Sequence, residues 1–219
     1  MTRRHGDAEA RGHGDITASP RPRVPASTNP VRTFCAIELS PAIRSRIQQH
    51  IERLRAALPE SQASWARVEN IHLTLKFFGD VQQKNIARIA KAAARAVDNF
   101  SSFQISISGT GAFPKINQPR VLWIGVDDNG SNLAELQKRF EKECASEGFP
   151  KEGRTFRPHL TIARTRKAEG ARALAELNQK LGFESMSLTV NELVVFRSEL
   201  SSKGSKYTVL SRHKLSDEL

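Results

Sequence analysis

The sequence predicts an α+β fold built on antiparallel sheets. Short segments of alternating apolar and polar residues are interspersed with longer ones in which apolar residues recur every three or four positions. Pairs of the short segments follow one another without a helix between them, which favours antiparallel pairing over a doubly wound parallel sheet. The segments 71–75 and 158–162 also read as near copies of each other, separated by about the length of one small lobe.

The expected elements begin with a strand over residues 33–39. Ser40 and Pro41 then predict a helix start, because a serine hydroxyl caps a helix well and proline fits its first position; this helix ends by Pro59. Further strands are expected over residues 70–79, 103–109, 120–126, 157–164, 187–197 and 207–213, with a connection over 111–119. Further helices are expected over residues 82–97, 133–148 and 168–181.

The chain divides into a tail and one domain. Residues 1–31 are rich in proline, glycine and serine and hold almost no large apolar side chain, so they cannot bury enough surface to offset the entropy of ordering. We expect a disordered basic tail over residues 1–31 and a single two-lobed domain over 32–219. At 219 residues the chain is long enough for a hydrophobic core without metal or disulfide support.

Charge and cysteine content narrow the function classes. The 34 Lys and Arg outnumber the 23 Asp and Glu, a net charge of +11, which favours a polyanionic partner such as nucleic acid; a basic surface that serves only solubility is the alternative. Cys35 and Cys144 are far apart and belong to no CxxC pair, so we expect two buried thiols in a reducing environment. Without a secretory signal or an apolar run of about 20 residues, we expect no membrane association and a cytoplasmic location.

The two near copies carry the chemistry. Because successive side chains of a strand point to opposite faces, His72 and Thr74 share one face of their strand, and His159 and Thr161 share one face of theirs. If a pseudo-two-fold relates the strands, the two pairs face each other across one cleft. One neutral imidazole could then accept a proton from water while a protonated one donates to a departing alkoxide, which suits cleavage of a phosphodiester.

Two other interpretations compete with a catalytic pair of histidines. A single histidine in an apolar strand is usually structural, but two histidines in matching contexts favour a site. A metal site is less favoured, because each strand supplies one imidazole and no Asp, Glu or Cys cluster accompanies it. We therefore expect no metal and no cofactor.

Several segments match a known family. They are Phe34 to Leu39, His72 to Gly79, Gly111 to Pro114, Pro119 to Trp123, and Arg157 to Arg164. With these motifs in this order, from about Thr33 to the C-terminus, the chain resembles the two-histidine (2H) phosphoesterases. Within them it resembles the RNA 2′,3′-cyclic phosphodiesterases, also called bacterial 2′-5′ RNA ligase-like proteins.

The resemblance implies a bilobal fold with antiparallel sheets lining a central cleft. It also implies a metal-independent reaction that opens a terminal 2′,3′-cyclic phosphate to a 2′-phosphate, with ligation of 2′-5′ linkages as a side or reverse reaction. His72 would be the proton donor and His159 the proton acceptor. Thr74 and Thr161 would bind the phosphate.

Four further residues are candidates for binding the substrate. Arg164 matches the family's arginine after the second motif, although strict alternation puts it on the face opposite His159, so a bulge or a surface role is needed. Phe34 and Phe113 could stack on the terminal base, with core packing as the alternative. Lys76 shares the His72 face by alternation and could attract phosphate, or it could be a solvent-exposed charge.

The leading hypothesis is therefore a monomeric enzyme acting on RNA with a 2′,3′-cyclic phosphate end. A non-catalytic module that grips RNA ends is one alternative. A cyclic phosphodiesterase acting on a small cyclic nucleotide is another.

Overall fold

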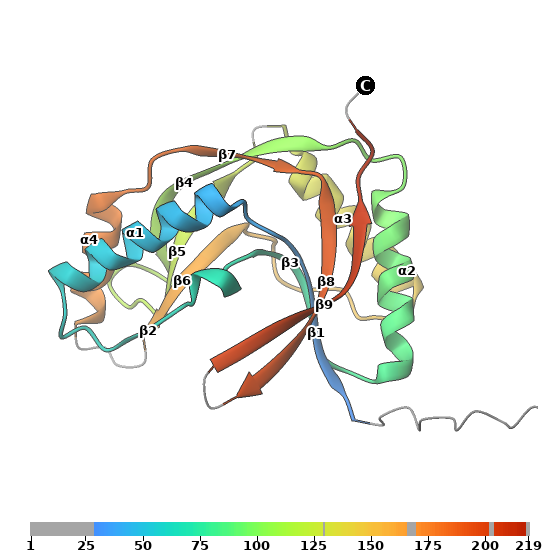
Figure 1. Ribbon diagram of the computed structural model, residues 1–219, viewed down its shortest axis with the longest axis horizontal. Coiled ribbons are helices and arrows are strands. Elements are labelled where there is room, and N and C mark those ends of the chain that lie inside the picture. Colours follow the sequence, from blue (N-terminus) through green and yellow to red (C-terminus); the bar gives the residue numbers. More distant parts are fainter. Residues whose placement is uncertain (1–28, 129, 166–169, 202–203, 218–219) are drawn as a thin grey trace, which may run out of the picture.

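The computed structural model describes residues 29–128, 130–165, 170–201 and 204–217 and arranges them in two antiparallel sheets flanked by helices (Figure 1). The four-stranded sheet has the order β3-β1-β8-β9, with β1 Val31–Ile37, β3 Leu73–Val81, β8 Glu192–Ser201 and β9 Gly204–Lys214. The five-stranded sheet has the order β2-β6-β5-β4-β7, with β2 Ala63–Trp65, β4 Phe103–Phe113, β5 Val121–Asp127, β6 His159–Thr165 and β7 Met186–Val190. The predicted α+β class with two antiparallel sheets is confirmed.

Each sheet is covered by helices that come from different parts of the chain. Helices α2 (Ile86–Val97) and α3 (Asn132–Ser146) pack together against the four-stranded sheet, whereas α1 (Pro41–Ala57) and α4 (Ala171–Leu181) pack together beside the five-stranded sheet (Figure 1). The short 3₁₀ helices η1 (Val68–Asn70) and η2 (Gln83–Asn85) precede β3 and α2. Within the described segments, no helix is both long and apolar enough to cross a membrane.

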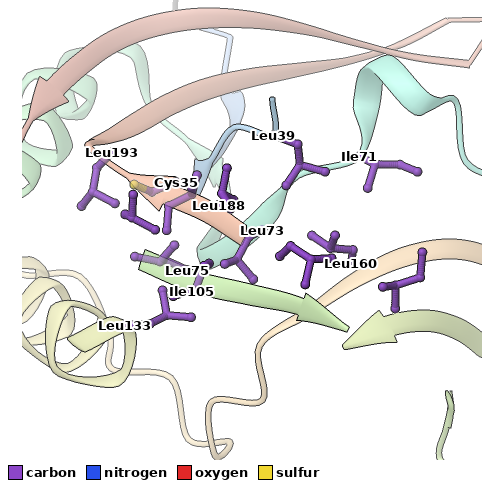
Figure 2. Packing of buried hydrophobic residues seen from close by; sticks show 14 of the residues in the cluster. Cys35, Leu39, Ile71, Leu73, Leu75, Ile105, Leu133, Leu160, Leu188 and Leu193 are labelled. Atoms are coloured by element: carbon purple, nitrogen blue, oxygen red, sulfur yellow. The ribbon is translucent and has the colours of Figure 1, made fainter. Parts of the chain in front are cut away.

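One hydrophobic core joins the two sheets. Leu73 of β3 and Leu160 of β6 are fully buried in the same cluster, although their strands belong to different sheets (Figure 2). Cys35 and Cys144 are buried free thiols, as predicted, and burial raises the pKa of Cys144 to about 12. The apolar faces of β3 and β6, the two strands that carry the His-x-Thr motifs, therefore pack into the same hydrophobic core.

The start of α1 follows its sequence signal. The backbone N–H of Ile43 donates to the Ser40 hydroxyl over 3.4 Å, and Pro41 occupies the first helical turn. Buried residues at Ile43, Ile47 and Ile51 then form the apolar stripe.

The main differences from expectation concern the strands, and most other element ends differ by a few residues. The single strand expected over 187–197 is two strands, β7 and β8, which diverge at Asn191 into different sheets. Strand β4 continues to Phe113 through part of the expected connection, because a register shift and a positive φ at Gly109 let the chain bend without leaving the sheet. Strand β2 was missed because it has only three residues, and β1 begins at Val31. The predicted tail lies outside the described residues, apart from residues 29–31.

Candidate active site

The two His-x-Thr strands open onto one cleft between the sheets. Strand β3 runs from Leu73, directly after His72, and β6 begins at His159. The cleft has a volume of about 660 Å³, and His72, Thr74, His159 and Thr161 all line it. The alternation of each strand buries the leucine between histidine and threonine and leaves both polar side chains facing the cleft.

Both imidazoles are oriented in the same way. The Nδ1 atom of His72 lies 2.8 Å from the carbonyl oxygen of Asn70, and Nδ1 of His159 lies 2.7 Å from that of Arg157. Because a carbonyl oxygen only accepts, Nδ1 carries the proton in each ring. Nε2 is therefore the atom that each histidine has left for proton exchange with a substrate.

The surroundings of His72 favour its neutral form. Burial lowers the pKa of His72 to about 4, the nearby Arg44 guanidinium lowers it too, and the hydrogen bond to Asn70 opposes both. Arg44 donates to the carbonyls of Leu39 and Val68, and the Asn70 amide donates to the carbonyl of Ser205 over 2.7 Å. The support of His72 thus comes from α1, η1 and β9.

Aromatic side chains pack on both histidines. The Phe34 ring is stacked on His72 with centroids 4.5 Å apart, and Tyr207 meets the same imidazole edge-on at 5.3 Å. Phe34 is only 2% exposed, so packing beneath His72, the alternative to base stacking, describes its position. Phe113 meets His159 edge-on at 5.0 Å and leans on Trp123, and it does not line the cleft. Phe34 also lines the cleft, and a role of either ring in binding a base stays a prediction.

A β-bulge brings Arg164 to the cleft. Leu122 pairs with Ala163, but the next residue, Trp123, pairs with Thr161, so Ile162 is an extra residue in β6. Ile162 and Ala163 are both buried, and the alternation resumes one residue later with Arg164 on the cleft side. Strict alternation therefore placed Arg164 wrongly, and the structure puts its guanidinium in the same cleft as His159.

A β-bulge in β3 likewise turns Lys76 away from the face of His72, where strict alternation placed it. Cys35 pairs with Lys76 and Ala36 with Thr74, which leaves Leu75 as the extra residue. Lys76 therefore points away from the cleft, is only 6% exposed, and donates to Glu141 of α3 and to the carbonyl of Pro150. It is neither a phosphate ligand nor a solvent-exposed charge.

The cleft is basic. Arg32, Arg67 and Arg164 line it, no Asp or Glu does, and none of these three guanidinium groups has an ion-pair partner in the part of the chain that the structure describes. Such a surface attracts a phosphate group. Among the described residues, no group of three or more His, Cys, Asp and Glu side chains is arranged to hold a metal ion.

Sequence reasoning missed several residues of the cleft. Trp65 is the last residue of the short strand β2, and Arg67 comes shortly after it. Tyr207 belongs to β9, and its ring contacts the imidazole of His72. Phe77 also lines the cleft, and aligning the two near copies would have found it, because it stands where the second copy has Arg164.

Comparison with known proteins gives the family. The model of the 2′-5′ RNA ligase superfamily matches residues 43–201. A Methanothermobacter thermautotrophicus protein named RNA 2′,3′-cyclic phosphodiesterase is 35% identical over 186 residues, which cover 84% of this chain and 99% of that protein. A Thermotoga maritima protein of the same name is 32% identical over 180 residues, covering 82% and 93%.

Solved structures share the fold. The protein TT0787 of Thermus thermophilus has a TM-score of 0.69 at 23% identity and covers 86% of this chain and 100% of its own. Escherichia coli LigT, solved with 3′-AMP, has a TM-score of 0.65 at 24% identity, with coverage of 85% and 98%. With its paired His-x-Thr motifs on one cleft, the chain belongs to the 2′-5′ RNA ligase superfamily of two-histidine phosphoesterases.

Proposed function

We propose that this protein hydrolyses a 2′,3′-cyclic phosphate at the end of an RNA and leaves a 2′-phosphate. The observation that carries the proposal is the presence of two imidazoles, each held through Nδ1 with Nε2 available, on one basic cleft. Curated relatives that match this chain over nearly their whole length are named RNA 2′,3′-cyclic phosphodiesterases. Their family acts on phosphodiester bonds, which makes a hydrolase the expected class of enzyme.

The proposed reaction uses the two histidines in opposite protonation states. Nε2 of neutral His159 accepts a proton from water as the water oxygen bonds to phosphorus. The bond from phosphorus to the 3′ oxygen breaks, and protonated His72 donates its Nε2 proton to that oxygen. Hydroxyls of Thr74 and Thr161 donate to the non-bridging oxygens, and the Arg164 guanidinium stabilises their growing negative charge. Proton exchange with solvent restores both rings.

The low pKa of His72 is consistent with a ring that is protonated only when an anion binds beside it. Its imidazole is neutral at neutral pH, because burial disfavours the charged form. A cyclic phosphodiester carries a negative charge, which favours protonation of a ring beside it. We propose that substrate binding supplies the charge that lets His72 hold the proton it donates.

Ligation needs the same groups in the same roles, with an RNA 5′ hydroxyl in place of water. The 5′ hydroxyl would give its proton to His159 as its oxygen bonds to phosphorus, the bond from phosphorus to the 3′ oxygen would break as His72 protonates that oxygen, and a 2′-5′ linkage would remain. We propose this ligation as a side activity.

The experiment is hydrolysis of an oligonucleotide ending in a 2′,3′-cyclic phosphate, in the presence of EDTA, by the wild type and by His72→Ala and His159→Ala. Each substitution should reduce turnover by about 10²–10⁴-fold. His213→Ala is the matched control, because His213 is a partly buried histidine of β9 that does not line the cleft, and it should keep full turnover.

Three results would replace the proposal. Full turnover by either cleft variant would rule out the two-histidine mechanism. Salt-sensitive RNA binding without any hydrolysis would select the RNA-end-binding module. Hydrolysis of small cyclic nucleotides but of no oligonucleotide would select the small-nucleotide enzyme.

A further inference from the structure

The two histidines are held alike, so the different roles proposed for them must come from their surroundings. In both strands Nδ1 lies within hydrogen-bond distance of the carbonyl two residues earlier, which belongs to Asn70 for His72 and to Arg157 for His159. The hydrogen bond at Nδ1 fixes both the tautomer and the orientation of a ring, and hence the direction in which Nε2 points. The segments that carry these carbonyls therefore help to aim each ring at the substrate.

The Asn70 carbonyl belongs to a short turn that one arginine holds in place. Asn70 is the last residue of the 3₁₀ helix η1, and Arg44 is a residue of α1. The Arg44 guanidinium donates to the carbonyl of Val68 over 3.1 Å and to that of Glu69 over 2.6 Å, the two residues before Asn70. It also donates to the carbonyl of Leu39, just before α1, over 3.1 Å. These three hydrogen bonds form the Arg44 clamp, which ties η1 to the start of α1.

The corresponding segment before His159 has no such clamp. Residues 155–158 lie outside helices and strands, and among the described residues the one side chain that donates to a carbonyl of this segment is that of His159 itself. The η1 turn is also held from its other side, because the Asn70 amide donates to the carbonyl of Ser205 in β9 over 2.7 Å. The clamp therefore distinguishes the proposed proton donor from the proposed proton acceptor.

We propose that Arg44 is a positioning residue for the proton donor. By holding η1 against α1, it keeps the Asn70 carbonyl at the place from which the His72 ring directs Nε2 toward the leaving 3′ oxygen. Arg44 does not line the cleft, so it acts through the turn and not on the substrate. This inference rests on the proposed function and deepens it.

The charge of Arg44 supports the same role. Burial is the main cause of the low pKa of His72, the hydrogen bond to Asn70 opposes it, Arg44 lowers the pKa further, and Glu38 at the end of β1 raises it. Tyr207 of β9 meets the ring edge-on. A cation near the ring makes the imidazolium a stronger acid. The proton that His72 takes up beside a bound phosphate is therefore released readily to the leaving oxygen.

The test compares two leaving groups. Arg44→Met should lower kcat for 2′,3′-cyclic AMP by about 10–10²-fold and leave KM nearly unchanged, because a misplaced donor fails in the transition state. On the 3′-thio analogue of this nucleotide, whose leaving group needs no proton, the same variant should keep wild-type turnover. Arg46→Met is the matched control and should change neither turnover, because Arg46 lies on the same helix, pairs with Glu184 at the surface and does not line the cleft.

A second substitution separates the clamp from the stability of the domain. Arg44→Lys keeps the charge, but one ammonium group cannot reach both Leu39 and the turn as the fork of a guanidinium does. It should therefore show a smaller loss than Arg44→Met, again with the oxygen ester alone. Equal loss with both esters, or full turnover of both, would overturn the positioning role. If Arg44→Met does not fold, Arg44→Lys decides by the same comparison.

NMR of histidine rings labelled with ¹⁵N distinguishes failure of this inference from failure of the proposed function. In the wild type at neutral pH, His72 should carry its proton on Nδ1. In Arg44→Met a second population with the proton on Nε2 should appear and the pKa of His72 should rise, while His159 stays unchanged. An unchanged His72 would overturn the inference. If Arg44→Met shows these changes but the wild type hydrolyses neither ester, the proposed function is overturned instead.

Discussion

Acidification should destabilise the wild-type protein more than a His72→Gln variant. Burial lowers the pKa of His72 from 6.5 to about 4, so the folded state keeps a neutral ring while the unfolded chain takes up a proton below its ordinary pKa. Each pH unit between the two pKa values lowers the free energy of unfolding by about 1.4 kcal/mol, so the loss reaches about 3 kcal/mol at about pH 4. Above the unfolded pKa this loss is absent, because both states are neutral.

Urea unfolding at several pH values, from about 7 down to about 4, measures the effect. Glutamine is the chosen replacement because it is neutral throughout and its amide can still donate to the Asn70 carbonyl. Burial also lowers the pKa values of His50 and His213, but these residues are present in both proteins and cancel in the difference. Parallel curves of unfolding free energy against pH for the two proteins would refute the reasoning.

Three further perturbations have defined outcomes. Arg164→Ala should lower turnover of 2′,3′-cyclic AMP by roughly 10²-fold, with Arg164→Lys in between, whereas unchanged turnover would remove the guanidinium from the reaction. Lys76→Met should lower the free energy of unfolding, measured in urea, by about 3–5 kcal/mol, because Glu141 is only 13% exposed and loses its partner. Adding Glu141→Leu should recover most of that loss. A loss below about 1 kcal/mol for Lys76→Met would contradict the buried ion pair. On a 3′-thio cyclic phosphate, whose leaving group needs no proton, His72→Ala should approach wild-type turnover while His159→Ala stays inactive, and the opposite ranking would exchange the two roles.

The periodic features of the sequence predicted the fold and the four polar residues at its centre. Alternation in the two near copies was enough to put His72 with Thr74 and His159 with Thr161, because a strand imposes its two-residue period until something interrupts it. The capped start of α1 is local in the same sense, since the Ser40 hydroxyl and Ile43 N–H are three residues apart.

The bulges could not be read from the sequence. A bulge depends on how a strand meets its neighbour, and the residues at Leu75 and Ile162 are ordinary apolar strand residues. A bulge before Arg164 was one of two options, because the family resemblance puts an arginine there, but nothing indicated the bulge in β3, so strict alternation put Lys76 on the wrong face and hid Phe77. The division at Asn191 is similar, because only the pairing of β7 with β4 and of β8 with β1 separates two equally apolar segments.

The cleft also depends on contacts between distant segments. Asn70 is fixed by the carbonyl of Ser205, and Arg44 by the carbonyls of Leu39 and Val68. No local pattern marks such pairs, so a single sequence does not reveal which polar residues support the histidines.

The claim that both histidines address one phosphorus atom can be tested by NMR of histidine side chains labelled with ¹⁵N during titration with inorganic phosphate. Assignments come from His72→Gln and His159→Gln. The Nε2 resonances of both rings should shift together and saturate with the same Kd, because one anion lies between them. A response of one ring alone, or two unrelated dissociation constants, would mean that the rings serve separate sites and would contradict the account.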